Sequence, residues 1–167
     1  EAFDKCGKIM GLDYPAGMHI DRLAKQAHSN NVLPPLPRPL LQHQGYDFSF
    51  SGVKTAFKQL YCKYHETVSI NDYCQRIQET IVDHLLRQIK RFYRDTQCKL
   101  PLVLAGGVAA NHYLRNRMHC WAESKGITLY YPSLCYCTDN AAMVAYTSAL
   151  QLREGAGKSY DDVLPRW

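Results

Sequence analysis

Apolar side chains recur at three- and four-residue steps along most of the chain, which is the period of an α-helix. Shorter runs with this period predict helices over 2–12, 18–28, 53–65, 109–125 and 139–154. The longest predicts a helix over 69–96, with apolar positions at Ile70, Cys74, Ile77, Ile81, Leu85, Ile89 and Phe92. The pattern therefore predicts a helix-rich fold.

Two short segments have instead the continuous apolar character of buried strands. They are residues 100–105 (LPLVLA) and residues 128–131, and each precedes a predicted helix or loop. Residues 48–50 fit either a third short strand or an extended approach to the next helix. The order strand, helix, strand, helix predicts an α/β fold with a small parallel sheet and a right-handed crossover. Two parallel strands cannot cover both faces of a sheet, so we expect partner strands to be missing from this chain.

Prolines and glycines mark the connections. Residues 14–17 predict a turn, because Pro15 fixes one backbone dihedral and Gly17 tolerates the left-handed region. Residues 30–47 hold four prolines, which remove backbone donors and predict an extended crossing segment. We assign one structural unit to 1–155 and a C-terminal tail to 156–167.

Composition narrows the class of protein. With 46% hydrophobic and 21% charged residues, the chain is an ordinary globular domain or a fragment of one, and not a disordered or collagen-like protein. No stretch reaches the roughly 18 to 20 apolar residues of a membrane helix, so we expect no membrane partner. The chain begins without Met and directly inside a helical pattern, which predicts a fragment.

The charge is mildly basic, with 20 Lys and Arg against 15 Asp and Glu. This balance permits an RNA or phosphate partner without demonstrating one. Basic residues gather at the end of the predicted helix 69–96, at Arg87, Lys90, Arg91 and Arg94. They fit a solvated face that complements the helix dipole, which we favour, or an RNA contact.

Cysteine usage predicts a reducing compartment. The seven cysteines are an odd number and are widely spread, which favours the cytoplasm over a disulfide framework. Only Cys135 and Cys137 are close in sequence. Without a second close pair or a histidine pair, a structural zinc site has little support.

The segment LAGGVAANHYLR, residues 104–115, is the first candidate for chemistry. A strand that ends in Gly106 and Gly107 and opens a helix presents backbone donors suited to a phosphate or ribose. Asn111, expected in the first helical turn, offers one acceptor and two donors to a sugar or base. A plain strand–helix turn capped by Asn111 explains the same residues equally well.

The segment CTDNAAMVAY, residues 137–146, is the second candidate. Thr138 or Asp139 fits the N-cap of the following helix, and Asp139 equally fits a carboxylate ligand of a metal ion. No two of the seven histidines stand four residues apart, so the remaining ligands are not evident in this chain. His112 and His119 are expected to be surface residues.

Two further groups carry weaker signals. Asp4 and Gly17 are suited to hold a ribose hydroxyl, but dipole complementation by Asp4 in a first helical turn is the simpler explanation. In DFSFSGVKTA, residues 47–56, Ser49 and Ser51 have no histidine and acid in a triad pattern, which argues against a serine hydrolase.

Together and in this order, EAFDK, GLDYPAG, DFSFSGVKTA, LAGGVAANHYLR and CTDNAAMVAY, with PRW near the end, resemble the C-terminal half of the Kae1/TsaD/Gcp family. The resemblance covers essentially the whole chain and is strongest to the bacterial TsaD type. It implies part of an actin-like (ASKHA) ATPase fold, with two RNase-H-like lobes and a ligand in the cleft between them. It also implies transfer of a threonylcarbamoyl group from threonylcarbamoyl-AMP to N6 of adenosine 37, in tRNAs that read ANN codons (t6A synthesis). Implied protein partners are TsaB-like and TsaE-like.

The resemblance assigns roles to particular residues. Asp4, Gly17 and Asn111 would contact threonylcarbamoyl-AMP, and the backbone of Gly106 and Gly107 would approach its nucleotide.

Asp139 would be the single metal ligand in this chain, for an iron or zinc ion. The other ligands would be an upstream His-x-x-x-His pair that this sequence does not contain.

The sequence also departs from the family pattern. The first lobe and its phosphate loop are absent, the turn reads PAGM where the family usually has PGGP, and CYCTDN has an extra cysteine. We therefore expect the isolated chain to be catalytically inactive and weak at binding metal. The alternative is a truncated, non-catalytic homologue that serves as an interaction module. A sugar kinase or Hsp70-like protein would lack EAFDK and FSFSG, and a metallo-endopeptidase would need an HExxH or equivalent motif.

Overall fold

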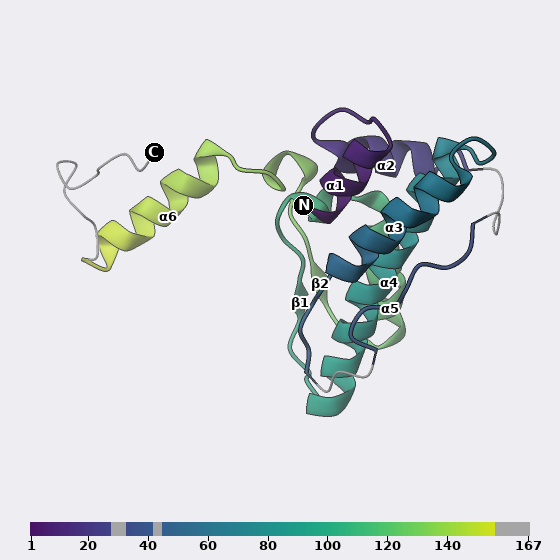
Figure 1. Cartoon of the computed structure of the whole chain (residues 1–167). Coiled ribbons are helices and arrows are strands. Elements are labelled where there is room, and N and C mark those ends of the chain that lie inside the picture. Colours follow the sequence, from purple (N-terminus) through teal and green to yellow (C-terminus); the bar gives the residue numbers. More distant parts are fainter. Residues whose placement is uncertain (28–32, 42–44, 156–167) are drawn as a thin grey trace.

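The computed structural model describes residues 1–27, 33–41 and 45–155 (Figure 1). The end predicted for the second helix, at His28, and the predicted tail 156–167 lie outside these residues. The elements in chain order are α1 (Ala2–Ile9), α2 (Ala16–Ala24), α3 (Ser51–Tyr64), α4 (Ile70–Thr96), β1 (Leu102–Val103), η1 (Gly107–Ala110), α5 (His112–Ser124), β2 (Leu129–Tyr130), η2 (Leu134–Tyr136) and α6 (Ala141–Arg153). The predicted α/β class with a small parallel sheet is confirmed.

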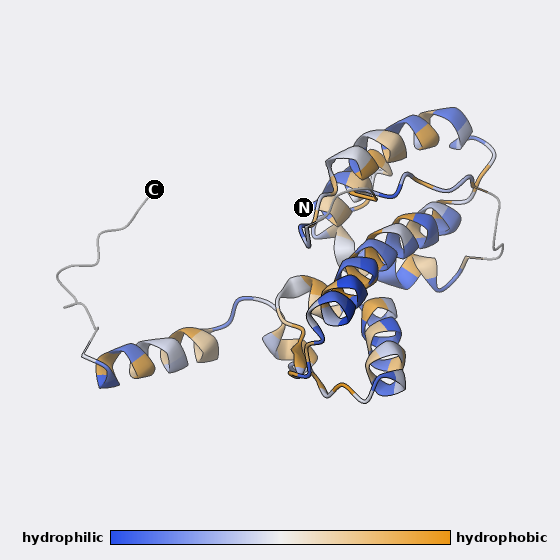
Figure 2. Ribbon diagram, turned by 90° about the horizontal axis from the view of Figure 1, so that it is seen from below, coloured by the Kyte–Doolittle hydropathy of each residue, from blue (hydrophilic) through white to orange (hydrophobic). Residues whose placement is uncertain are grey.

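Helix α4 is the central element, and it packs against helices at both of its ends. Its start is defined by Ser69, whose hydroxyl accepts a hydrogen bond from the Asn71 backbone N–H at 3.3 Å. Its end is defined by Gln97, which adopts the left-handed conformation at φ 52°. Figure 2 shows apolar and polar residues alternating along this and the other helices. This alternation gives α4 one stripe that is buried over most of its length.

The first half of that stripe forms a core with α1, α2 and α3. Tyr73 and Ile77 of α4 are completely buried there, as are Ile20 of α2 and Phe57 of α3. A Cβ added at Gly7 of α1 would lie 2.1 Å from the Ala16 side chain, so only glycine permits α1 and α2 to approach this closely.

The second half of the stripe forms a separate core with α5 and the sheet. Leu86 of α4 meets Met118 and Trp121 of α5, and the Tyr93 and Trp121 rings pack edge to face at 5.4 Å. Strands β1 and β2 are parallel, with Leu102 opposite Leu129 and Val103 opposite Tyr130.

Both strands are shorter than predicted, because the backbone pairs only where the two segments lie opposite each other. Leu102 N–H bonds Thr128 O at 2.9 Å and Leu104 N–H bonds Tyr130 O at 2.8 Å. Val103 and Tyr130 remain exposed, so one face of this sheet is uncovered by the described residues. Residues 48–50 were predicted to form either a strand or an extended approach to the next helix. They form no strand and lie against α4.

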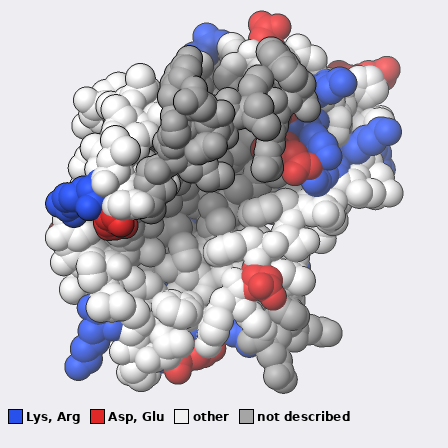
Figure 3. Space-filling model, turned by 90° about the vertical axis from the view of Figure 1, so that its left-hand side faces the viewer, with Lys and Arg blue, Asp and Glu red and all other residues white. Residues whose placement is uncertain are grey.

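Helix α6 extends away from the other elements (Figure 1), and none of its residues is buried. It begins at Ala141, because the Asn140 side chain accepts a hydrogen bond from the Met143 N–H at 3.0 Å. The prediction of Thr138 or Asp139 as the N-cap is therefore wrong. In the view toward this side of the molecule, most of the visible described surface is uncharged (Figure 3). Among the described helices, none is both long and apolar enough to cross a membrane.

His84 of α4 is a buried titratable residue of the fold. Its buried ring lies edge to face with Phe48 and Phe50, accepts from Ser49 N–H at Nε2 and meets Arg87 Nη2 at Nδ1, 2.8 Å away. Burial, followed by the nearby Arg87 charge, lowers the pKa of His84 below its ordinary value of 6.5. Each of the two ring nitrogens faces a donor. A protonated ring carries an N–H on both nitrogens, so it would point both N–H groups at donors.

We therefore expect the free energy of unfolding to fall as the pH drops below about 6.5. In that range His84 is protonated in the unfolded chain and neutral in the folded chain. This difference ends once the pH falls below the lowered pKa of His84 in the folded state. Urea titrations between pH 5 and 8 measure how the free energy of unfolding changes with pH. The native chain and the control variant His119→Gln, which replaces an exposed histidine, should show the same slope. A slope of the same size in His84→Gln would contradict the assignment.

Candidate functional site

The turn after β1 exposes its backbone. Gly106 has φ 85° and ψ 173°, a conformation that favours glycine, and Gly107 begins η1. A Cβ added at either position would meet nothing within 4 Å. Neither glycine is thus required by packing, and only Gly106 is required by backbone conformation. The backbone at Gly107 is accessible to a ligand.

Asn111 ends this turn, and its side chain holds α5 in place. Its Oδ1 accepts from the Leu114 N–H at 2.8 Å, and its Nδ2 donates to Gln78 Oε1 of α4 at 2.7 Å. The residue is only 7% exposed. Of the two interpretations offered by the sequence, the helix cap is confirmed, although Asn111 is the cap and not a first-turn residue.

Arg115 joins this turn to the segment that leads to Asp139. Its Nε donates to the Ala109 carbonyl, and its Nη2 donates to Pro132 O at 2.8 Å and to Cys137 Sγ at 3.1 Å. The guanidinium also lies over the Tyr131 ring, 4.6 Å from its centroid. Arg115 lies within the motif LAGGVAANHYLR, but nothing in the sequence marks it as a functional residue.

Helix α2 connects Asp4 and Gly17 to the turn at Gly106 and Gly107. Asp4 Oδ1 accepts from the Ala16 N–H at 2.9 Å, so this carboxylate of α1 caps α2. That cap explains why α2 starts at Ala16 and not at Met18, and it places Gly17 in the first helical turn instead of the preceding loop.

A polar contact between two side chains joins α2 to α5. His112 Nδ1 lies 2.8 Å from Asp21 Oδ2, and the His112 side chain is 53% exposed, as expected for a surface residue. Lys25 Nζ lies 3.3 Å from the same carboxylate oxygen. No local pattern in the sequence marks Asp21, because its partner His112 lies 91 residues away. Through this pair, the structure connects the start of α5 to the helix that carries Gly17.

The residues present do not complete a metal site. Asp139 is exposed and has no ion pair in the described part of the chain. Within residues 1–27, 33–41 and 45–155, no three His, Cys, Asp or Glu side chains are grouped so that they could hold a metal ion. Cys135 is exposed, whereas Cys137 is buried against Arg115. One carboxylate is too small a donor set for zinc or iron, so no chemical step is assigned to a metal here.

Comparison with known proteins identifies relatives of the whole chain. Residues 1–146 match the family model described as "TsaD: tRNA N6-adenosine threonylcarbamoyltransferase". Proteins named tRNA N6-adenosine threonylcarbamoyltransferase are 40% identical in Verminephrobacter eiseniae (strain EF01-2), and 38% identical in Ralstonia pickettii (strain 12J) and Legionella pneumophila (strain Corby). Each alignment covers 100% of this chain but only 49% or 50% of the relative. The chain thus spans about half the length of the curated relatives it matches.

Proposed function

The chain belongs to the TsaD family of tRNA N6-adenosine threonylcarbamoyltransferases, and on this premise we propose that it forms the C-terminal part of a t6A-synthesising enzyme. That enzyme transfers the threonylcarbamoyl group from threonylcarbamoyl-AMP to N6 of adenosine 37, in tRNAs that read ANN codons. The chain itself is an incomplete part of an actin-like fold and inactive by itself.

The observation that carries the proposal is the exposed turn at Gly106 and Gly107. It opens at the end of a parallel strand and is fixed by Asn111 on one side and Arg115 on the other. The carboxyl end of a parallel strand, followed by a glycine turn and a helix, is where nucleotide phosphates bind in α/β folds.

The transfer forms a bond between N6 and the carbamoyl carbon and breaks the bond from that carbon to the AMP phosphate oxygen. Negative charge develops on the departing phosphate, which leaves as AMP, and the proton lost from N6 passes to water. The backbone N–H of Gly107 is suited to stabilise that phosphate, because a fixed dipole needs no reorganisation. Asn111 would donate its remaining amide proton to the same ligand. Gly17 of α2, and Asp4, which caps α2, would contact the end of the ligand that lies away from the phosphate.

The proposal extends to the components that the chain does not contain. Asp139 is proposed as one ligand of an iron or zinc ion, with the other ligands from the upstream histidine pair. TsaB-like and TsaE-like proteins are the proposed partners, and the cytoplasm is the proposed location.

Gly107→Ala tests the site directly. Its methyl group would stand where the nucleotide approaches, so we expect at least about a tenfold weaker affinity for a stable threonylcarbamoyl-AMP analogue, measured by calorimetry on the full chain. Gly52→Ala is the matched control, since a Cβ there also meets nothing within 4 Å. Equal affinity in the two variants would contradict the assignment of this turn.

A second measurement separates an enzyme part from an interaction module. Single-turnover t6A formation should be undetectable with the chain alone and should appear when the upstream half of a relative is supplied. Activity of the chain alone would refute its incompleteness. Failure to bind the analogue or to restore activity would favour the non-catalytic interaction module.

A further inference from the structure

A broad groove lies between the C-terminal halves of α4 and α5, away from the glycine turn. It has a volume of about 1040 Å³ and is lined by four separate parts of the chain. These are the extended segment at Arg38, helix α4, the loop at Lys99, and α5 with the residues that follow it. Leu86 and Trp121 of the second core form part of its base.

The groove concentrates the positive charge of the protein. Five arginines and three lysines line it, against one lining carboxylate, Asp83, and the adjacent Asp95. The local excess is six positive charges, whereas the whole chain has an excess of five. The charged residues elsewhere therefore nearly balance, and the groove accounts for the basic character of the chain.

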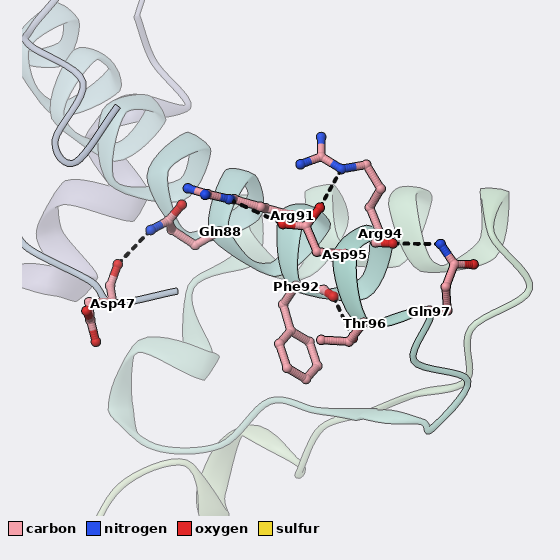
Figure 4. Close-up of polar contacts among 8 residues, drawn as sticks. All are labelled: Asp47, Gln88, Arg91, Phe92, Arg94, Asp95, Thr96 and Gln97. Atoms are coloured by element: carbon pink, nitrogen blue, oxygen red, sulfur yellow. Dashed lines mark hydrogen bonds and ion pairs between the residues drawn. The ribbon is translucent and has the colours of Figure 1, made fainter. Parts of the chain in front are cut away.

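Only some of these charges are neutralised. Arg91 and Arg94 both reach Asp95, at 3.4 Å and 2.8 Å, as Figure 4 shows. Arg117 pairs with Asp83 at 2.8 Å.

The other basic residues of the groove leave it strongly positive. Within the described part of the chain, Arg38, Lys90, Lys99 and Lys125 have no ion pair, and all four are exposed. Burial lowers the pKa of Arg87, and the neighbouring Arg38 charge lowers it further. Like charges crowded in this way are stabilised by a bound polyanion.

Complementation of the helix dipole does not explain the arrangement. The C-terminal ends of α4 and α5 each contribute only about half a negative charge. Moreover, Arg38 lies far from either helix in sequence, so the helix dipoles do not explain its position in the groove. This geometry favours an RNA contact over a solvated face as the role of the basic cluster.

We propose that this groove binds the phosphate backbone of tRNA; the identity of the RNA rests on the proposed function. Arginine is well suited to this role, because its planar guanidinium donates two parallel hydrogen bonds to a phosphate. Contacts spread over four chain segments match a repeating row of phosphates better than a single small anion.

The test reverses three exposed, unpaired lysines in the groove, with Lys90→Glu, Lys99→Glu and Lys125→Glu combined. The matched control reverses exposed Lys8, Lys58 and Lys63, which gives the same net charge outside the groove. Binding of an ANN-reading tRNA is measured by fluorescence anisotropy from 50 to 200 mM salt. We expect the groove variant to bind at least about 30-fold more weakly, with a salt slope smaller by about 2 to 3, and the control to bind within about threefold of the native chain.

Several outcomes would overturn the inference: equal losses in both variants, no tRNA binding by the native chain at 50 mM salt, or equally tight binding of poly-glutamate. Circular dichroism and the corresponding Lys→Gln variants exclude misfolding as the cause of a loss. The glycine turn is tested separately, because Gly107→Ala should bind tRNA normally. The groove variant should lose tRNA binding but still bind the threonylcarbamoyl-AMP analogue. This result distinguishes a failure of the groove from a failure of the proposed function.

Discussion

Phe57→Ala is expected to lower the free energy of unfolding by about 3 to 5 kcal/mol, a large part of the roughly 5 to 15 kcal/mol that stabilises a domain. The Phe57 side chain is completely buried, and its ring packs edge to face on Tyr73 with centroids 6.0 Å apart. The Tyr73 hydroxyl is itself buried and has no hydrogen-bond partner in the described part of the chain. Tyr73 is therefore held by packing, and removal of the Phe57 ring leaves a cavity beside it.

Phe92→Ala is the matched control. Its ring is 39% exposed near the end of α4, where it contacts Tyr46 and Tyr93. We expect a loss of about 1 kcal/mol or less, because this side chain is only partly removed from water. Urea denaturation followed by far-ultraviolet circular dichroism measures both. Equal losses would mean that the core of α1, α2, α3 and α4 does not form as described.

The sequence predicted the helices well where one periodic stripe determines them. Helix α4 was predicted to within one residue at its start, because the apolar stripe and the Ser69 cap both lie in the local sequence. The start of α2 was missed, because its cap is the Asp4 carboxylate, twelve residues from Ala16. The strands were predicted too long, because an apolar run does not show where a partner strand ends.

The site was predictable only as far as its motifs reach. Gly106, Gly107 and Asn111 stand together in sequence and mark the turn without the structure. Asp21 and Arg115 act through contacts with distant segments, and no local pattern reveals such contacts. The groove is similar, since Arg38 joins α4 and α5 there only through the fold.

Asn111→Ala is expected to cost about 2 to 4 kcal/mol of stability. The loss combines the N-cap of α5, worth about 0.5 to 2 kcal/mol, with a buried Gln78 oxygen left without its donor, worth about 1 to 3 kcal/mol. In a Gln78→Leu background the second contribution disappears, so Asn111→Ala should then cost only the cap. Equal losses in the two backgrounds would contradict the contact with Gln78.

Asn111→Asp separates the structural role of this residue from its proposed role in binding. A carboxylate caps a helix as well as an amide does, and the Gln78 side chain can rotate to donate its own amide protons to it. We therefore expect at most about 1 kcal/mol of destabilisation. Binding of the threonylcarbamoyl-AMP analogue should nevertheless weaken by about tenfold or more, because a negative charge replaces a donor beside the phosphate. If Asn111→Asp kept both stability and affinity, Asn111 would be a helix cap alone, and the nucleotide would have to bind without it.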